Sequence, residues 1–210
     1  MMSDICRLIY VHDPMCSWCW GFRPSFLALC EQLPEQVAVS LLLGGLAQDS
    51  DQPMPAQLQS KLQDTWRKIQ TRIPDTRFNF DFWDKCRPRR STWPACRAVI
   101  AARTLAPALE SDMILAIQSA YYLEARNPSD TSTLVSLAAG LGLDQSDFEI
   151  LLDAPDTRDA LQREISQARQ MGADSFPSLR LQIGESIWPV TVDYTRSGPM
   201  LDTIRALLDS

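Results

Sequence analysis

Two cysteines separated by two positions are the residues best able to do chemistry. Cys16 and Cys19 lie in the segment DPMCSWCWGFRP, and the remaining cysteines are scattered along the chain. A close pair of this kind either ligates a metal or cycles between a dithiol and a disulfide. A structural zinc site usually needs a second close pair or two histidines. The chain has a single histidine, His12, so we expect no metal and favour redox chemistry.

The residues after Cys16 predict a helix that begins at this cysteine. Apolar side chains recur at helical spacing from Phe22 to Leu33 and stop at Pro34. The unpaired N–H groups and positive dipole at a helix start favour a thiolate, and thiols of CxxC pairs can have pKa values lowered to roughly 3.5 to 7.5. We therefore predict that Cys16 is the exposed nucleophile and that Cys19, one turn further on, is the shielded resolving thiol.

Two predicted strands flank this helix. Residues 5–12 and 37–43 are apolar runs that end at Asp13-Pro14 and at a Gly-Gly pair. Pro24 is expected to bend the helix rather than break it. This order is a β-α-β unit, and it places the cysteine pair at the carboxyl end of the first strand. We expect Asp13 to shape the turn that carries the pair.

Helical spacing dominates the middle of the chain, from residue 46 to residue 171. One of these helices is expected to be capped by Ser91 or Thr92. The expected helices run through residues 58–69, 94–100, 113–122, 134–141 and 155–168.

The chain after this helical region returns to strands. Residues 178–183 and 187–192 predict a hairpin, in which Pro189 marks an edge strand, and a last amphipathic helix follows. The fold class is therefore α/β, with an all-helical insertion between two pieces of one β-containing domain. The expected domains are residues 1–45 with 172–210, and the insertion 46–171, whose last helix, about 155–171, could also pack on the sheet.

Composition and charge exclude several classes of protein. Lys+Arg 20 against Asp+Glu 26 gives a net charge of −6, so neither nucleic acid nor a membrane surface is an expected partner. No apolar run is long enough to span a bilayer. Arg7, His12 and Asp13 interrupt the opening, which does not fit a secretory signal. We therefore expect a cytoplasmic protein, in which thiols are kept reduced.

The layout and the motif resemble the thioredoxin fold with a DsbA-type insertion. Among its branches the chain is most similar to the leaderless, FrnE-like group of cytoplasmic disulfide oxidoreductases or isomerases. The residue-level likeness is strong over residues 13–24 and 175–179. This resemblance implies that Cys16 and Cys19 are the redox pair and that Pro177 is a cis proline facing it.

Further residues become candidates for the site. The resemblance implies that the backbone of Phe176, before Pro177, pairs with an extended substrate. Trp18 is expected either to contact unfolded substrate or simply to pack. His12, four positions before Cys16, could stabilise a thiolate or shuttle its proton, or be a hydrogen-bonded strand-end histidine. The dipeptide Ser17-Trp18 differs from that of thioredoxin and of periplasmic DsbA, which leaves the reduction potential open.

Two other groups of residues have alternative interpretations. A basic cluster flanked by tryptophans either binds a carboxylate such as that of glutathione or forms a solvated loop. Cys86 and Cys96 are either an auxiliary redox pair or separate thiols, whereas Cys6 and Cys30 are expected in the core. The basic cluster consists of Lys85, Arg87, Arg89 and Arg90, between Trp83 and Trp93.

The favoured function is a thiol–disulfide oxidoreductase or isomerase that acts on protein disulfides by dithiol–disulfide exchange through a mixed disulfide. No cofactor is expected, apart from glutathione as a possible redox partner. One alternative is a glutathione-dependent isomerase of the 2-hydroxychromene-2-carboxylate type, although such enzymes typically carry serine where Cys16 stands. The other alternative is a non-catalytic peptide-binding holdase.

Overall fold

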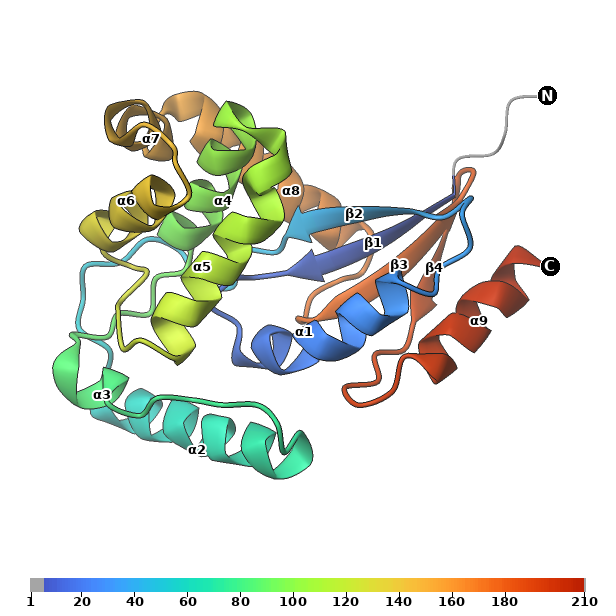
Figure 1. Cartoon of the computed structure of the whole chain (residues 1–210), viewed down its shortest axis with the longest axis horizontal. Coiled ribbons are helices and arrows are strands. Elements are labelled where there is room, and N and C mark those ends of the chain that lie inside the picture. The colour runs from blue at the N-terminus through green and yellow to red at the C-terminus, as the bar shows by residue number, and fades with distance from the viewer. Residues whose placement is uncertain (1–5, 210) are drawn as a thin grey trace.

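The computed structural model describes residues 6–209, and its centre is a four-stranded mixed sheet (Figure 1). The strands are β1 (Cys6–His12), β2 (Ala38–Leu43), β3 (Ser178–Ile183) and β4 (Ser186–Val190). Their order in the sheet is β2-β1-β3-β4. β1 pairs in parallel with β2 and antiparallel with β3, and β3 pairs antiparallel with β4. The predicted β-α-β unit and hairpin are confirmed, and Pro189 lies on the edge strand β4.

Alternating side chains of β1 point to two different apolar layers. Leu8 and Tyr10 belong to the layer that holds α1 (Ser17–Cys30) and α9 (Gly198–Leu208). Ile9 and Val11 face the opposite side, where Ala168 of α8 (Pro155–Gln170) packs. Because successive residues of a strand point to opposite faces, one apolar strand supports helices on both sides.

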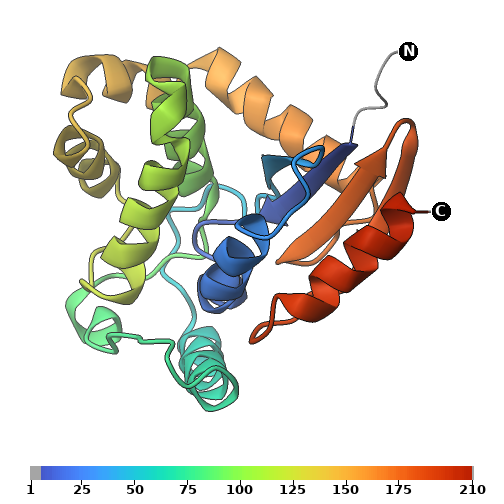
Figure 2. The same ribbon diagram turned by 45° about the vertical axis from the view of Figure 1, so that its right-hand side comes forward.

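The middle of the chain builds a separate helical core beside the sheet (Figure 2). Its helices are α2 (Ala56–Arg72), α3 (Phe82–Lys85), α4 (Trp93–Leu105), α5 (Glu110–Tyr122), α6 (Thr131–Gly140) and α7 (Gln145–Leu152), with a 3₁₀ turn at Pro107–Leu109. Trp66 is fully buried among the aromatic rings of this core. Met15 and Leu43 belong to the same cluster, so the core continues to the ends of β1 and β2. The structure thus confirms an α/β fold with a large helical part.

Helix α8 contacts both the helical part and the sheet. It packs against α4 and against β2. The Glu164 carboxylate of α8 accepts a hydrogen bond from the backbone N–H of Leu43, 2.7 Å away, on the edge strand β2. Glu164 also pairs with Arg103 of α4. The division of the chain into two domains at residues 45 and 172 stays a prediction, and α8 joins the two parts.

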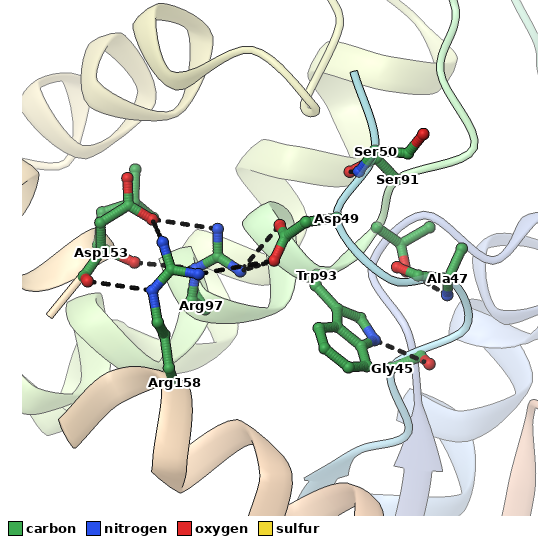
Figure 3. Close-up of polar contacts among 11 residues, drawn as sticks. Gly45, Ala47, Asp49, Ser50, Ser91, Trp93, Arg97, Asp153 and Arg158 are labelled. Carbon is green, nitrogen blue, oxygen red and sulfur yellow. Dashed lines mark hydrogen bonds and ion pairs between the residues drawn. The ribbon is translucent and has the colours of Figure 1, made fainter. Parts of the chain in front are cut away.

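A buried arginine fixes the connection between β2 and α2 (Figure 3). Arg97 of α4 donates to both carboxylate oxygens of Asp49, at 2.9 and 2.8 Å. It also donates to the Leu152 carbonyl at 3.0 Å and to Asp153 at 3.1 Å, at the end of α7. Three segments distant in sequence therefore meet at one guanidinium.

The structure corrects some details of the expected helices. The sequence did not predict α3 or α7. As expected, Pro24 does not break α1, which continues to Cys30. Thr92 precedes α4 at the N-cap position, yet its hydroxyl bonds to Asp13 instead of capping the helix. Within residues 6–209, no helix combines the length and apolar character required to cross a bilayer.

Candidate active site

A buried carboxylate holds the turn between β1 and α1. Asp13 accepts hydrogen bonds from the backbone N–H of Met15 at 2.8 Å and of Leu46 at 2.7 Å. The Thr92 hydroxyl donates to it at 2.6 Å and the Cys96 thiol at 3.5 Å. Burial raises the pKa of Asp13, and these hydrogen bonds work in the opposite direction. Asp13 therefore shapes the turn, as predicted, and ties it to the β2–α2 connection and to α4.

Cys16 occupies the N-cap position of α1. Its backbone is extended, with φ −81° and ψ 114°, and its N–H donates to the Asp13 carbonyl at 3.0 Å. The backbone N–H groups in the first turn of a helix have no intrahelical acceptor. The thiol thus lies at the positive end of the α1 dipole.

The loop before β3, which comes from the C-terminal part of the chain, contacts the Cys16 thiol. The Cys16 thiol lies 3.5 Å from the carbonyl oxygen of Phe176, and the Phe176–Pro177 peptide bond is cis, as the resemblance implies. The Phe176 ring packs against the backbone of Gly44, where any Cβ atom would overlap the ring. The absence of a side chain at Gly44 makes room for the bulky residue before the proline.

Cys16 is less accessible than predicted. Only 7% of its surface is exposed, because the Phe176 loop and residues of the helical part surround the start of α1. The thiol still lines a cleft of about 380 Å³. Other lining residues are Met15, Ser17, Trp18, Leu46, Met54, Leu62, Thr65, Arg89, Arg90, Thr92, Tyr121, Asp174, Ser175 and Phe176. Cys16 is thus buried rather than exposed as predicted, and it lies at the wall of a mainly apolar cleft.

Cys19 lies beneath the surface, as a shielded thiol should. Its exposed fraction is 0%, and burial raises its pKa well above the ordinary value of 9.0. Its hydrogen bond with Cys16 raises this pKa further, whereas a hydrogen bond with the Tyr10 hydroxyl lowers it. Cys19 lines a second cavity of about 500 Å³, which is also lined by Arg23 and Gln118.

His12 belongs to the cavity of Cys19, not to the cleft of Cys16. The side chain is buried, and its ring stacks on Tyr10 with centroids 5.0 Å apart. Its Nε2 atom has no hydrogen-bond partner among the described residues. Burial, followed by the charges of Arg103 and Arg23, lowers the pKa of His12 to about 3. The imidazole is therefore neutral at physiological pH.

Trp18 lies at the border of the cleft. Its ring is tilted against Tyr194 with centroids 5.1 Å apart. The Arg72 guanidinium lies 5.7 Å from the Trp18 ring and 5.1 Å from the Tyr194 ring. Trp18 is thus packed on one side while it lines the cleft, so both expected roles fit its position.

The basic cluster is divided by the structure. Arg89 and Arg90 reach the cleft, and Arg89 pairs with Asp130 at 2.6 Å. Arg90 is exposed at the rim and forms no ion pair with the described residues. Lys85 instead pairs with Asp81, away from the lining of the cleft.

Cys86 and Cys96 have different hydrogen-bond acceptors. The Cys86 thiol donates to the Ala125 carbonyl at 3.1 Å, whereas the Cys96 thiol donates to Asp13. Both thiols are free in the structure. Within the described chain, no group of three or more His, Cys, Asp or Glu side chains is arranged to hold a metal.

Two contacts from the helical part reach the CxxC segment. The indole N–H of Trp66 donates to the Ser17 hydroxyl at 2.9 Å. Trp20 stacks on Tyr122, with ring centroids 5.6 Å apart. Sequence reasoning placed Trp66 only in the core of the insertion, because no local pattern reports a partner that is 49 positions away.

The β-α-β unit, the antiparallel hairpin and a CxxC pair facing a cis-proline loop define a thioredoxin-fold protein. Residues 7–189 match the family model of the DSBA-like thioredoxin domain. The chain belongs to this family, whose members are generally thiol–disulfide oxidoreductases.

Solved structures share the fold over almost the whole chain. The cytosolic disulfide reductase DsbM from Pseudomonas aeruginosa is 26% identical, with a TM-score of 0.74 and 97% of each chain covered. A second structure of DsbM contains GSH. A candidate protein disulfide isomerase from Nitrosomonas europaea is 24% identical, with a TM-score of 0.84 and 97% and 98% of the two chains covered.

A curated relative is similar in sequence over part of its length. The ClpXP adapter protein SpxH from Halalkalibacterium halodurans is 24% identical over 170 residues, which cover 79% of this chain. The chain spans only 55% of the length of that relative.

Proposed function

We propose that this protein reduces disulfides of other proteins through Cys16 and Cys19, with glutathione as the electron donor. The observation that carries the proposal is the position of the Cys16 thiol, at a helix start, on the wall of a cleft, and 3.5 Å from the Phe176 carbonyl. The likeness to a cytosolic disulfide reductase at 26% identity supports the reductive direction. A cytoplasmic location is part of the same proposal.

The exchange begins at Cys16. Its thiolate attacks one sulfur of the substrate disulfide, so that a mixed disulfide forms and the other substrate sulfur leaves as a thiolate and takes up a proton. Cys19 then loses its proton and attacks the Cys16 sulfur. The second substrate thiol leaves, and the enzyme is left with a Cys16–Cys19 disulfide. Two glutathione molecules reduce this disulfide and become one molecule of oxidised glutathione.

The cleft is suited to an extended polypeptide. The Phe176 carbonyl beside Cys16 is a backbone acceptor that a strand of substrate would use in the mixed disulfide. Trp18, Leu46 and Met54 supply apolar walls around the same place. Such walls are suited to the apolar side chains that an unfolded client exposes.

Cys19 must be deprotonated inside the protein. Its burial raises its pKa, so an internal proton acceptor would speed the second step. His12 and Tyr10 line the cavity of Cys19. With its pKa lowered to about 3, the neutral imidazole is too weak a base to hold this proton, but its Nε2 atom, which has no partner among the described residues, can accept a hydrogen bond from a water that passes the proton on. We assign His12 this shuttle role, on the side of Cys19 rather than of Cys16.

Glutathione carries carboxylates, and the rim of the cleft carries a free cation. Arg90 faces the cleft without an ion-pair partner among the described residues. A guanidinium recognises a carboxylate through paired N–H donors. The GSH in a structure of DsbM supports the same choice of electron donor.

The direct test is the glutathione-driven reduction of a model protein disulfide such as that of insulin. Cys16→Ala should abolish the reaction, because no other residue forms the mixed disulfide. Cys19→Ala should accumulate a mixed disulfide that mass spectrometry detects. Cys86→Ala is the matched control and should keep its activity, since this thiol bonds to a carbonyl outside the cleft lining.

Other outcomes would favour the alternative functions. Full activity of Cys16→Ala would contradict the proposal. Saturable glutathione binding without a dithiol–disulfide cycle would instead indicate a glutathione-dependent isomerase. Suppression of client aggregation that survives the double Cys16→Ala, Cys19→Ala change, with no reductase activity in the unmodified protein, would indicate a holdase.

A further inference from the structure

A hydrogen bond from the helical part ends within the CxxC motif itself. The Trp66 indole N–H donates to the Ser17 hydroxyl at 2.9 Å, and both side chains are buried. Ser17 is the first residue of α1 and directly follows Cys16. A residue of α2 is therefore bonded to the turn that carries the nucleophile.

The donor end of this bond is held rigidly. Trp66 has an exposed fraction of 0%, and aromatic rings pack around its indole on several sides. Since packed side chains have few alternative rotamers, the N–H cannot follow Ser17 if the start of α1 moves. The surrounding rings are those of Phe78, Phe80, Phe82, Trp83, Tyr121 and Tyr122.

The start of α1 has a further attachment to the helical part, through Trp20. Trp20 stacks on Tyr122, and its own indole N–H donates to the Arg77 carbonyl at 3.0 Å. Loss of the Trp66 hydrogen bond should thus loosen the first turn without detaching the helix from the helical part.

We infer that Trp66 is a positioning residue for the redox pair, which acts by fixing Ser17 and, through it, the first turn of α1, whose unpaired backbone N–H groups directly follow Cys16. These N–H groups stabilise a thiolate only when they point at the sulfur. The helical part then helps to set how strongly the dithiol form is favoured over the disulfide. This inference rests on the proposed redox cycle of Cys16 and Cys19.

The direction of the effect follows from thiolate stabilisation. A stabilised thiolate favours the reduced form of a CxxC pair and makes its disulfide more oxidising. Loosening the first turn removes part of that stabilisation. Trp66→Phe keeps an aromatic ring but removes the N–H donor, so it should make the pair more readily oxidised.

The experiment measures the equilibrium constant between the Cys16/Cys19 pair and glutathione in four proteins. These are the unmodified chain, Trp66→Phe, Ser17→Ala and the double variant. Each single change should shift the constant toward the disulfide at least threefold, which corresponds to about 14 mV for a two-electron couple. Since both changes break the same bond, the double variant should match the single ones instead of adding their effects.

Trp83→Phe is the matched control. Trp83 belongs to the same aromatic cluster and packs on Trp66, but its indole N–H has no hydrogen-bond partner among the described residues. A purely structural effect of a lost indole should appear equally in this variant. We expect Trp83→Phe to keep the equilibrium constant of the unmodified chain.

An unchanged constant in both Trp66→Phe and Ser17→Ala would overturn the inference, as would additive shifts in the double variant or an equal shift in Trp83→Phe. If Trp66→Phe fails to fold, Ser17→Ala decides alone. A failure of the redox cycle itself has a different signature, because the unmodified chain would then form no Cys16–Cys19 disulfide at any glutathione ratio.

Discussion

At the scale of single residues, the thiols of Cys16 and Cys19 lie in different surroundings. Cys16 lies at the N-cap and lines a cleft, whereas Cys19 is fully buried and its pKa is raised by burial. Cys16 therefore faces the cleft, whereas Cys19 has no exposed surface and lines the other cavity. The order of the two steps that we propose for Cys16 and Cys19 rests on this difference in surroundings.

The first prediction concerns the cation at the rim of the cleft. Arg90→Ala should raise the KM for glutathione about tenfold, because one charge-assisted hydrogen-bonded pair of about 1.4 kcal/mol is lost. Turnover driven by dithiothreitol, which has no carboxylate, should not change. Steady-state kinetics with both reductants measure the two effects.

A control variant distinguishes a contact between Arg90 and a glutathione carboxylate from the mere loss of one positive charge. Arg87 belongs to the same basic cluster but does not line the cleft, so Arg87→Ala should behave as the unmodified chain. Equal effects of the two substitutions on the KM for glutathione, or an equal loss of turnover with dithiothreitol, would show that Arg90 does not bind glutathione.

Which residues of the site could be predicted depends on the distance of their partners along the chain. Cys16 and Cys19 are recognisable because their spacing and the following helix are local. The contact of Trp66 with Ser17 was not predictable from local patterns, since it arises only when α2 packs on α1. The burial of Cys16 was mispredicted for the same reason, because the segments that cover it are distant in sequence.

At the scale of elements, the connection from β2 to α2 matters because it lines the cleft through Leu46 and Met54. Arg97 holds this connection at Asp49 and joins it to the end of α7 (Figure 3). The guanidinium is buried while both carboxylates remain half-exposed. The hydrogen bonds of one arginine thus keep a wall of the cleft in place.

The second prediction concerns this arginine. Arg97→Met should lower the free energy of unfolding by about 2 kcal/mol, because several charge-assisted hydrogen bonds are lost while the carboxylates stay solvated. Urea unfolding measures the change. Arg67→Met is the control: its pair with Asp64 is exposed, so its loss should cost less than about 0.5 kcal/mol. A similar cost for both variants would show that the buried network contributes little.

The elements themselves were predictable to different degrees. Strand β1 and helix α9 follow clear apolar patterns, and the structure places them where expected. Helix α7 was missed because it has only 8 residues and its pattern is too short to show a period. Its start carries a local signal, since Asp144 accepts a hydrogen bond from the Asp147 N–H at 3.0 Å. A search for capping residues could have found it.

At the scale of the whole molecule, one sheet is covered by helices on both faces, and the helical part packs against the carboxyl ends of β1 and β2 (Figures 1 and 2). This arrangement buries the strand end that leads to the site. His12, the last residue of β1, is therefore buried. Protonation of its ring should lower the free energy of unfolding of the whole chain.

The third prediction is a pH dependence of stability that originates at His12. Burial lowers the pKa of His12 from 6.5 to about 3 in the folded chain. As the pH falls below 6.5, the unfolded chain gains a proton that the folded chain takes up only near pH 3, so stability decreases as the pH falls through this window. The contribution of His12 should decrease by about 2 kcal/mol between pH 7 and pH 5.

Urea unfolding at several pH values tests this expectation. His12→Gln carries no titrating ring, so its stability should fall less steeply between pH 7 and pH 5 than that of the unmodified chain. Comparison of the two slopes cancels the other titrating groups, among them the buried Asp13. Parallel slopes would show that His12 is not held neutral by burial.

The central claim is that Cys16 and Cys19 form one reversible redox pair. It is tested most directly by equilibrating the protein with a series of ratios of reduced to oxidised glutathione, blocking the free thiols, and identifying the blocked cysteines by peptide mass spectrometry. We predict that Cys16 and Cys19 lose their reactivity together along a two-electron curve, with a mass that shows a disulfide between them. Protection of only one of the two thiols, or of neither across the whole series, would contradict the account.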